Sequence, residues 1–188
     1  MKNASLISKI TEPMAIVTGM VLLGAIHAGI EGAGLVLFIL YMSMVSIVVW
    51  VARIRFMTSL RTNWDVSERP KRVRMLVILS GFSILLFLSF MLWQNAELIT
   101  LCIGLLVWLF GFSLITLKTK ISGHMGVLTL AIGMLARWYG NGWYALFFFL
   151  PIVAWSRLFL KRHTMIEVIG GTLYSVMMLI LFNMWSLW

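Results

Sequence analysis

The most regular feature of this chain is a series of long apolar runs separated by short polar stretches. A helix needs about 17 or more mostly apolar residues to cross a bilayer core, and each run reaches that length. Because backbone amides inside a bilayer cannot bond to water, such runs are expected to be helical. The expected spans are residues 13–31, 34–53, 73–93, 97–117, 123–139, 143–160 and 166–186. The pattern predicts an all-α transmembrane helical bundle of six to seven spans, with residues 1–188 forming a single membrane domain.

The number of spans decides which polar stretches share a side of the membrane. The two shortest runs, 123–139 and 143–160, are separated by Tyr139-Gly140-Asn141-Gly142, a sequence typical of a turn. With seven spans, three polar stretches lie on the same side as the N-terminus: residues 54–72, 118–124 and 157–165. The candidate chemistry is therefore expected at one membrane face.

Composition supports a bilayer as the environment of the chain. Hydrophobic residues make up 62% of it and charged residues 11%, and the mean hydropathy is +1.02, whereas a soluble domain carries roughly a quarter charged residues. The single cysteine, Cys102, cannot form an intrachain disulfide, and three histidines without further cysteines give no metal-site spacing. The sequence predicts an integral membrane protein with no metal site and no cofactor, and leaves its oligomeric state open.

The formal net charge of +9 is distributed unevenly. Every lysine and arginine except Arg137 lies towards the side that carries the three polar stretches. Phosphorylated lipids and anionic headgroups are the expected partners of this pattern, and nucleic acid is not expected. The positive-inside rule predicts a multi-pass protein of the cytoplasmic (cell) membrane, with the three stretches facing the cytoplasm.

The most specific polar pattern is Ser156-Arg157, followed by His163 and Glu167. His163 and Glu167 are four residues apart, so they share one face if the last helix begins near His163. A carboxylate beside one imidazole nitrogen selects the tautomer and supports the positive charge that develops when the other nitrogen attacks. Arg157, six residues earlier, can bind phosphate oxygens with its planar set of donors.

The middle stretch reads Lys120-Ile121-Ser122-Gly123-His124 and comes directly before an apolar run. Ser122 is a plausible N-cap, and the amides at a helix start favour an anion. Gly123 lets the backbone approach a ligand closely. His124 is then placed beside that anion, where it can give a proton to a leaving oxygen.

The first stretch, residues 61–72, is the longest polar interval in the chain. It contains two of the six acidic residues, Asp65 and Glu68, among several arginines and lysines. Taken alone, it is compatible with a basic loop at a headgroup surface.

Taken in order, the three stretches resemble the type 2 phosphatidic acid phosphatase superfamily. The signature of that family is Lys-x6-Arg-Pro, then Pro-Ser-Gly-His, then Ser-Arg-x5-His-x3-Asp. The matching residues are Arg69-Pro70, Ser122-Gly123-His124 and Ser156-Arg157-x5-His163-x3-Glu167. The resemblance covers about residues 61–171 and implies a site at one face of a helical membrane bundle.

The resemblance also implies a role for each matching residue. His163 would be the nucleophile that takes the phosphoryl group, Glu167 its orienting carboxylate, and His124 the general acid for the leaving group. Arg69, Arg157 and the backbone of Ser122 and Gly123 would hold the phosphate oxygens. A water molecule would then hydrolyse the phosphohistidine, and the family needs no metal for this chemistry.

Three positions depart from the family signature. Ile121 stands in place of proline, Glu167 in place of aspartate, and Thr62 in place of the lysine of the first motif. Thr62 cannot supply the positive charge of that lysine. The residues considered for the missing cation are Arg61, Lys71, Arg72 and Lys120, and the sequence does not choose among them. Asp65 can order the loop by pairing with an arginine.

Three functions are compatible with these patterns. The leading hypothesis is a lipid phosphatase that acts on phosphatidate-like or isoprenoid phosphates and diphosphates, whose tails stay in the bilayer. The second is a lipid phosphotransferase, in which an alcohol replaces water as acceptor. The third is a non-enzymatic phospholipid-binding or transport protein, which should also have ionisable residues along a path through the bilayer. The span interiors contain few such residues, which disfavours transport.

Overall fold

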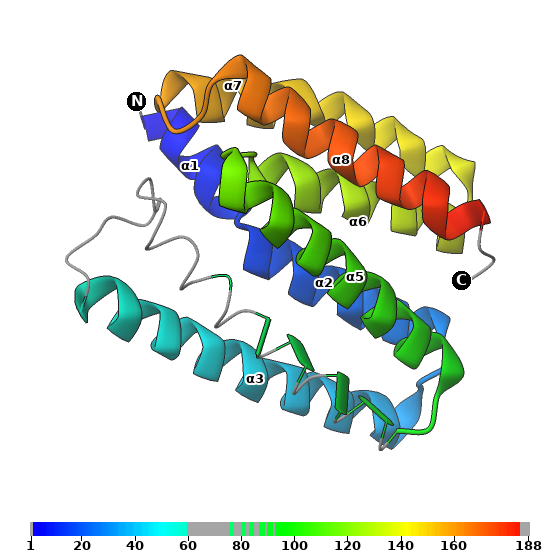
Figure 1. The fold of residues 1–188 in the computed structure, drawn as a ribbon. Helices are drawn as coiled ribbons and strands as arrows, with labels where there is room; N and C mark the ends of the chain where they lie inside the picture. Colours follow the sequence, from blue (N-terminus) through cyan, green and yellow to red (C-terminus); the bar gives the residue numbers. More distant parts are fainter. Residues whose placement is uncertain are drawn as a thin grey trace. The chain divides into compact units, whose positions relative to one another are not determined.

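The computed structural model describes residues 2–59 and 93–184, together with positions 76, 80, 81, 83, 84, 87, 88, 90 and 91. Its elements are all helical (Figure 1), which confirms the predicted all-α fold. In chain order they are α1 (Lys2–Ile10), α2 (Pro13–His27), α3 (Gly32–Ser59), α5 (Ala96–Lys118), α6 (Gly123–Tyr139), the 3-10 helix η1 (Asn141–Phe149), α7 (Leu150–Phe159) and α8 (Met165–Met184).

Several of these helices are long and apolar enough to cross a membrane. Among the described residues the candidate spans are Lys2–His27, Gly32–Ala52, Ala96–Lys118, Asn141–Phe159 and Met165–Met184. Helix α6 has 17 residues, which is at the lower limit for a span. The expected span at 73–93 lies mostly outside the described residues. Large apolar side chains such as Phe148 and Ile166 are about four-fifths exposed, at 81% and 82%, as expected of a surface that faces lipid.

The chain divides into two compact units. Unit 1 comprises Met1–Val21 and Thr119–Trp188, and unit 2 comprises Leu22–Lys118. A single membrane domain over residues 1–188 stays a prediction. Apart from Lys118, the middle and last polar stretches belong to unit 1, so the candidate site can be described within that unit.

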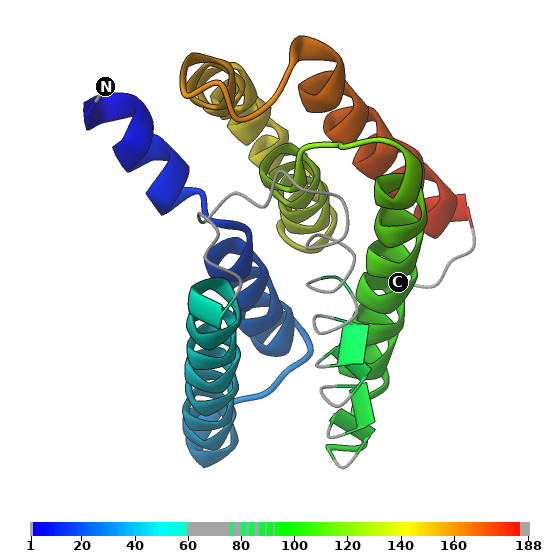
Figure 2. The same ribbon diagram turned by 60° about the vertical axis from the view of Figure 1, so that its left-hand side comes forward.

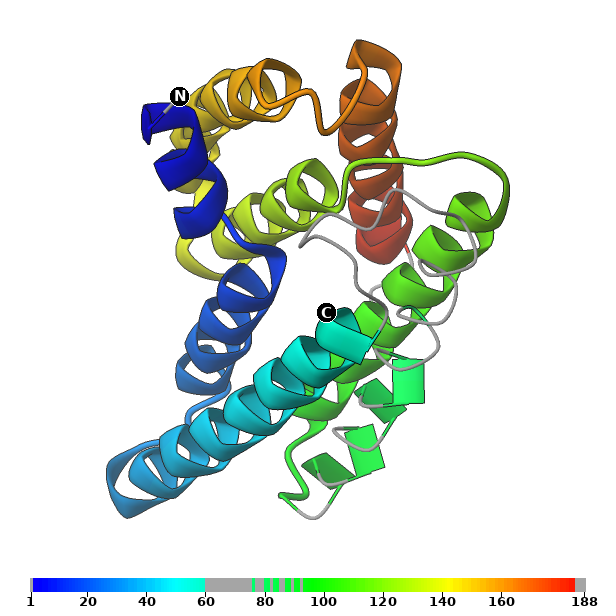
Figure 3. The same ribbon diagram turned by 90° about the vertical axis from the view of Figure 1, so that its left-hand side faces the viewer.

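Unit 2 contains the long helix α3, which Figure 3 shows in cyan as one continuous element. Its fully buried Phe38 packs edge-on against Trp93, with ring centroids 5.3 Å apart. Helix α5 begins after Asn95, whose Oδ1 accepts the backbone N–H of Leu98 at 3.0 Å and whose Nδ2 donates to the carbonyl of Ala28 at 3.0 Å. This is an N-cap that also ties the loop before α3 to the start of α5.

In unit 1, α6 lies along α8, and α7 connects to α8 by a short turn (Figure 2). Glycines make the close approach possible. A Cβ at Gly133 of α6 would collide with the side chain of Leu179 of α8. A Cβ at Gly171 of α8 would collide with the carbonyl oxygen of Ser122, whose N and C atoms would lie 3.2 Å away. Small residues commonly allow this spacing between membrane helices, and here they bring the start of α6 against α8.

Replacing Gly171 by alanine should therefore destabilise unit 1. The added methyl group meets backbone, which cannot rotate away, so we expect a loss of about 1–3 kcal/mol of stability. The measurement is the thermal unfolding midpoint of purified protein in detergent. Gly170→Ala is the matched control, because its nearest neighbour is the Ile121 Cγ2 side-chain atom at 3.1 Å. Equal midpoints for the two variants would contradict this account.

The span expected over 143–160 is present as the candidate span Asn141–Phe159, but it consists of two elements, η1 and α7, rather than one α-helix. Pro151 explains the break, because it has no N–H and its ring clashes with the carbonyl four residues earlier. The same residue is well suited to the first turn of α7, where that N–H is not needed. The predicted turn before this segment is present, with Gly140 at φ 101° ending α6.

The N-terminal helix α1 was not expected from the apolar pattern. It packs beside α7, as Figures 1 and 3 both show. Ala4 is buried there, and its carbonyl accepts the hydroxyl of Ser156 at 2.7 Å. Ile7 of α1 joins an apolar cluster centred on buried side chains of α6, α7 and α8: Met125, Val153 and Val168. All four helices of this end of unit 1 therefore share one small core.

Candidate functional site

Helix α7 ends in a turn that directs the chain towards His163. Lys161 adopts the left-handed conformation at φ 52°. Its N–H bonds to the carbonyl of Leu158 at 2.9 Å, and the N–H of Arg162 bonds to the carbonyl of Arg157 at 3.0 Å. These two bonds define a Schellman motif, formed with lysine where glycine is more usual. The backbone just before His163 is therefore anchored to the turn that carries Arg157.

Helix α8 begins with a capping box. The Thr164 Oγ1 atom accepts the N–H of Glu167 at 3.3 Å, and the Glu167 Oε2 atom accepts the N–H of Thr164 at 3.0 Å. This reciprocal pair satisfies two backbone donors at the helix start. The two hydrogen bonds of the capping box therefore fix the position of the Glu167 carboxylate.

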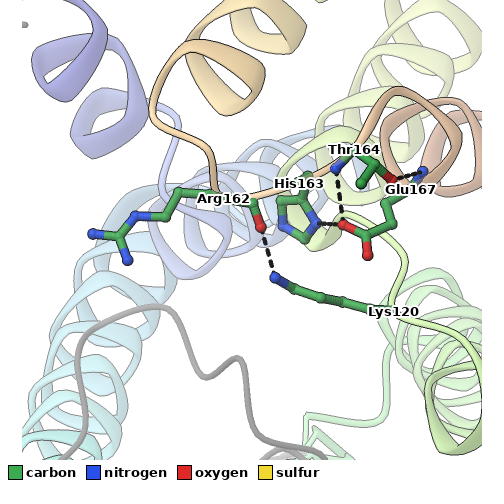
Figure 4. A network of polar contacts seen from close by, with 5 residues as sticks. All are labelled: Lys120, Arg162, His163, Thr164 and Glu167. Carbon is green, nitrogen blue, oxygen red and sulfur yellow. Dashed lines mark hydrogen bonds and ion pairs between the residues drawn. The ribbon is translucent and has the colours of Figure 1, made fainter.

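His163 uses the same carboxylate oxygen. Its Nδ1 atom lies 3.0 Å from Glu167 Oε2 (Figure 4). Because α8 begins only at Met165, His163 precedes the helix, and the two side chains meet across the helix start rather than on one helix face. The His163 side chain is 6% exposed and that of Glu167 23%.

This geometry selects a tautomer of His163. An ionised carboxylate can only accept, so the proton of the neutral imidazole is placed on Nδ1 and the lone pair on Nε2. The low exposure of the ring strengthens the electrostatic interaction with Glu167. The pair has the arrangement required of an imidazole that attacks through Nε2 and becomes positively charged.

The middle polar stretch lies directly against this pair. The N–H of Ser122 donates to the carbonyl of Glu167 at 2.9 Å. The Lys120 Nζ atom donates to the carbonyl of Arg162 at 2.6 Å, which puts a cation beside the residue before His163 (Figure 4). The guanidinium of Arg162 itself points away from the imidazole in that view. The second and third stretches, 40 or so residues apart in the chain, are thus adjacent.

Ser122 occupies the N-cap position of α6, as predicted. Its buried hydroxyl makes no cap bond and has no hydrogen-bond partner among the described residues. Its amide, which was expected to help hold phosphate, is engaged by Glu167. The amides of Gly123 and His124 belong to the first turn of α6, and helix geometry provides no carbonyl within the helix for them.

Arg157 and His124 both contact the same residue of α1. Arg157 is 4% exposed, and its Nη1 donates to the Ser8 Oγ atom at 2.6 Å. The His124 Nε2 atom lies 3.3 Å from the Ser8 carbonyl oxygen. Ser8 therefore connects the arginine of the third stretch to the histidine of the second.

The first stretch contributes nothing that can be placed. Five candidate residues lie outside the described residues: Arg61, Asp65, Arg69, Lys71 and Arg72. Their roles stay predictions. Within the described ranges, no three histidine, cysteine, aspartate or glutamate side chains gather as possible ligands of a metal ion.

Three residues that shape this site were missed in the sequence. Thr164 was recognisable, because Thr-x-x-Glu before an apolar run is a capping-box pattern. Gly171 carried a weaker signal, as a small residue in a membrane helix. Ser8 carried none, since nothing local links it to residues more than 100 positions away.

Comparisons with protein-family models, with curated proteins and with solved structures found no match. The class defined by the structure is an all-α, multi-span membrane protein with a cluster of basic, histidine and carboxylate side chains where α1, α6, α7 and α8 meet. The resemblance to type 2 phosphatidic acid phosphatases rests on the order and spacing of the motif residues.

Proposed function

We propose that this protein is a membrane-embedded phosphatase that hydrolyses phosphate or diphosphate monoesters of lipids through a phosphohistidine intermediate. The observation that carries the proposal is the 3.0 Å contact between His163 Nδ1 and Glu167 Oε2 at the capped start of α8. The resemblance to type 2 phosphatidic acid phosphatases assigns nucleophile and orienting carboxylate to these same two residues.

The first half of the reaction forms the phosphohistidine. The His163 Nε2 lone pair attacks phosphorus, and the bond between phosphorus and the leaving oxygen breaks. His124 gives a proton to that oxygen, so a neutral alcohol or a protonated phosphate departs. Glu167 stabilises the positive charge that develops on the His163 ring.

The second half returns the enzyme to its starting state. Water attacks phosphorus and the phosphorus–nitrogen bond breaks, which releases inorganic phosphate. His124, now neutral, takes the proton from the attacking water. Each group ends in its original protonation state, so the cycle consumes one water molecule and needs no other co-reactant.

The charges near the pair support an anionic substrate. The Lys120 Nζ atom reaches the backbone carbonyl beside His163, and Arg157 belongs to the turn that leads to His163. Arginine donors and a lysine point charge are the usual ligands of phosphate oxygens. The apolar surface of the helices is suited to a substrate whose tail remains in lipid. On the charge bias of the sequence, the site faces the cytoplasm at the cell membrane.

The proposal predicts release of inorganic phosphate by the purified protein in mixed micelles. Phosphatidate and a prenyl diphosphate are the two substrates to compare, and phosphate release should continue when a chelator is added, since the family resemblance implies chemistry that needs no metal. Turnover on at least one substrate should fall in the usual range of roughly 1–1,000 per second.

The same assay with excess alcohol separates hydrolysis from transfer. Phosphorylated alcohol in place of free phosphate would make the protein a phosphotransferase instead. Absence of both products with both lipids would overturn the proposed function.

A further inference from the structure

We propose that Ser8 of α1 is a positioning residue of this site, which orients Arg157 through its hydroxyl and His124 through its carbonyl. This inference rests on the proposed function and adds an element that the family motifs do not contain. Two contacts carry it: Arg157 Nη1 to Ser8 Oγ at 2.6 Å, and His124 Nε2 to the Ser8 carbonyl at 3.3 Å.

The Ser8 carbonyl is available because α1 is short. The last four carbonyls of a helix lack donors within the helix, and α1 ends at Ile10. Pro13 supplies no N–H and clashes with the carbonyl four residues earlier, so the backbone hydrogen bonds of α1 do not continue without interruption into α2. The next amides bond elsewhere, Thr11 to Ile7 and Glu12 to Lys9. The carbonyl of Ser8 meets the imidazole of His124 instead.

This contact defines which nitrogen of His124 can act as the acid. A carbonyl only accepts, so His124 Nε2 carries a proton. The second proton of the imidazolium is then on Nδ1, and the carboxyl end of α1 favours that positive charge. In the transfer step the Nδ1–H bond breaks and an O–H bond forms on the leaving oxygen. His124 becomes neutral while its Nε2–H stays directed at Ser8.

The hydroxyl of Ser8 has a different effect on Arg157. A neutral oxygen fixes the plane of the guanidinium without cancelling its charge, whereas a carboxylate in the same place would compete with phosphate. Ser8 is itself held in place, because the bond from Ser156 to the Ala4 carbonyl clamps α1 to α7 one turn earlier. The Ser8 hydroxyl therefore holds the Arg157 guanidinium in a defined orientation without itself neutralising its charge.

Three variants test the role of the hydroxyl. Ser8→Ala removes Oγ and keeps the carbonyl, so KM should rise roughly tenfold, the effect of losing one hydrogen bond to a charged group, while kcat and the pH profile change little. Ser8→Thr restores a hydroxyl and should return KM towards the wild-type value. Ser5→Ala, the same chemical change on the same helix, should leave KM unchanged. Ser8→Ala kinetics equal to those of Ser5→Ala, or no recovery in Ser8→Thr, would overturn the inference.

Titration with inorganic phosphate separates this inference from the proposed function. Weaker phosphate binding by about tenfold in Ser8→Ala than in Ser5→Ala supports the role of Ser8 even if the wild-type protein hydrolyses no lipid. Equal phosphate affinity in the two variants contradicts it even if hydrolysis is found. A wild-type protein that binds no phosphate contradicts both proposals.

Discussion

Replacing His163 by asparagine should lower phosphate release by about a thousandfold or more, since it removes the nucleophile itself. Asparagine is chosen because its amide can still donate to Glu167 Oε2, the contact made by His163 Nδ1. It has no atom in the position of Nε2. The measurement is the initial rate of phosphate release in micelles, with thermal unfolding to confirm that the variant is folded.

His27→Asn is the matched control for this variant. His27 also precedes a glutamate, Glu31, by four residues, and both side chains are exposed. Its replacement should leave the rate within about twofold of wild type, as is usual for a surface substitution. A rapid-quench experiment with labelled substrate should trap an acid-labile phosphoryl group on the wild-type protein and none on His163→Asn. Label retained in that variant, or an undiminished rate, would exclude His163 as nucleophile.

Replacing Glu167 by glutamine should lower kcat by roughly a hundredfold to ten-thousandfold, with a smaller effect on KM. Glutamine has the same length, and its carbonyl oxygen can still accept the Thr164 N–H in the capping box. It lacks the negative charge that stabilises the imidazolium, and its amide can turn towards Nδ1 and favour the wrong tautomer. The measurement is kcat against KM over a series of lipid concentrations.

Two further variants separate the charge of Glu167 from its part in the helix cap. Thr164→Ala removes the hydroxyl that accepts the Glu167 N–H and should cost about 1 kcal/mol of stability. It leaves the carboxylate and its contact with His163, so kcat should fall much less than in Glu167→Gln. Glu31→Gln, at the equivalent spacing after His27, should leave both kcat and stability unchanged. A decrease in kcat in Thr164→Ala as large as that in Glu167→Gln would assign Glu167 a structural role only.

Much of the fold could be predicted from apolar runs alone. The expected span 97–117 corresponds to α5 at Ala96–Lys118, and 123–139 coincides with α6. The length of an apolar run predicts a span because the thickness of the bilayer sets a minimum length for each spanning helix independently. The expected span 143–160 corresponds to the candidate span Asn141–Phe159, although it consists of η1 and α7 rather than one α-helix, since Pro151 prevents an unbroken α-helical ladder there. The apolar runs gave no sign of α1, which packs against α7.

The candidate site was less accessible to prediction than the fold. The pairing of His163 with Glu167 followed from their spacing, although it is made across the start of α8 and not on one helix face. The span count placed the Lys120 and His163 stretches at the same membrane face, and the family resemblance placed them in one site, but no local rule predicts the contact of Lys120 with the Arg162 carbonyl. The contacts of Ser8 could not be predicted from the sequence, because they depend on how α1 packs in three dimensions.

The separation of Ser8 and Arg157 in the chain has a consequence for biosynthesis. The two residues are 149 positions apart, and a ribosome adds roughly 5–20 residues each second. Helices α1 and α2 are therefore made long before α7 can bind to them. Until then α1 lacks the hydrogen bonds from Ser156 and Arg157 that hold it in unit 1. A nascent chain that has inserted its first helices thus remains incapable of completing the site, and α1 must stay accessible until α7 has entered the membrane.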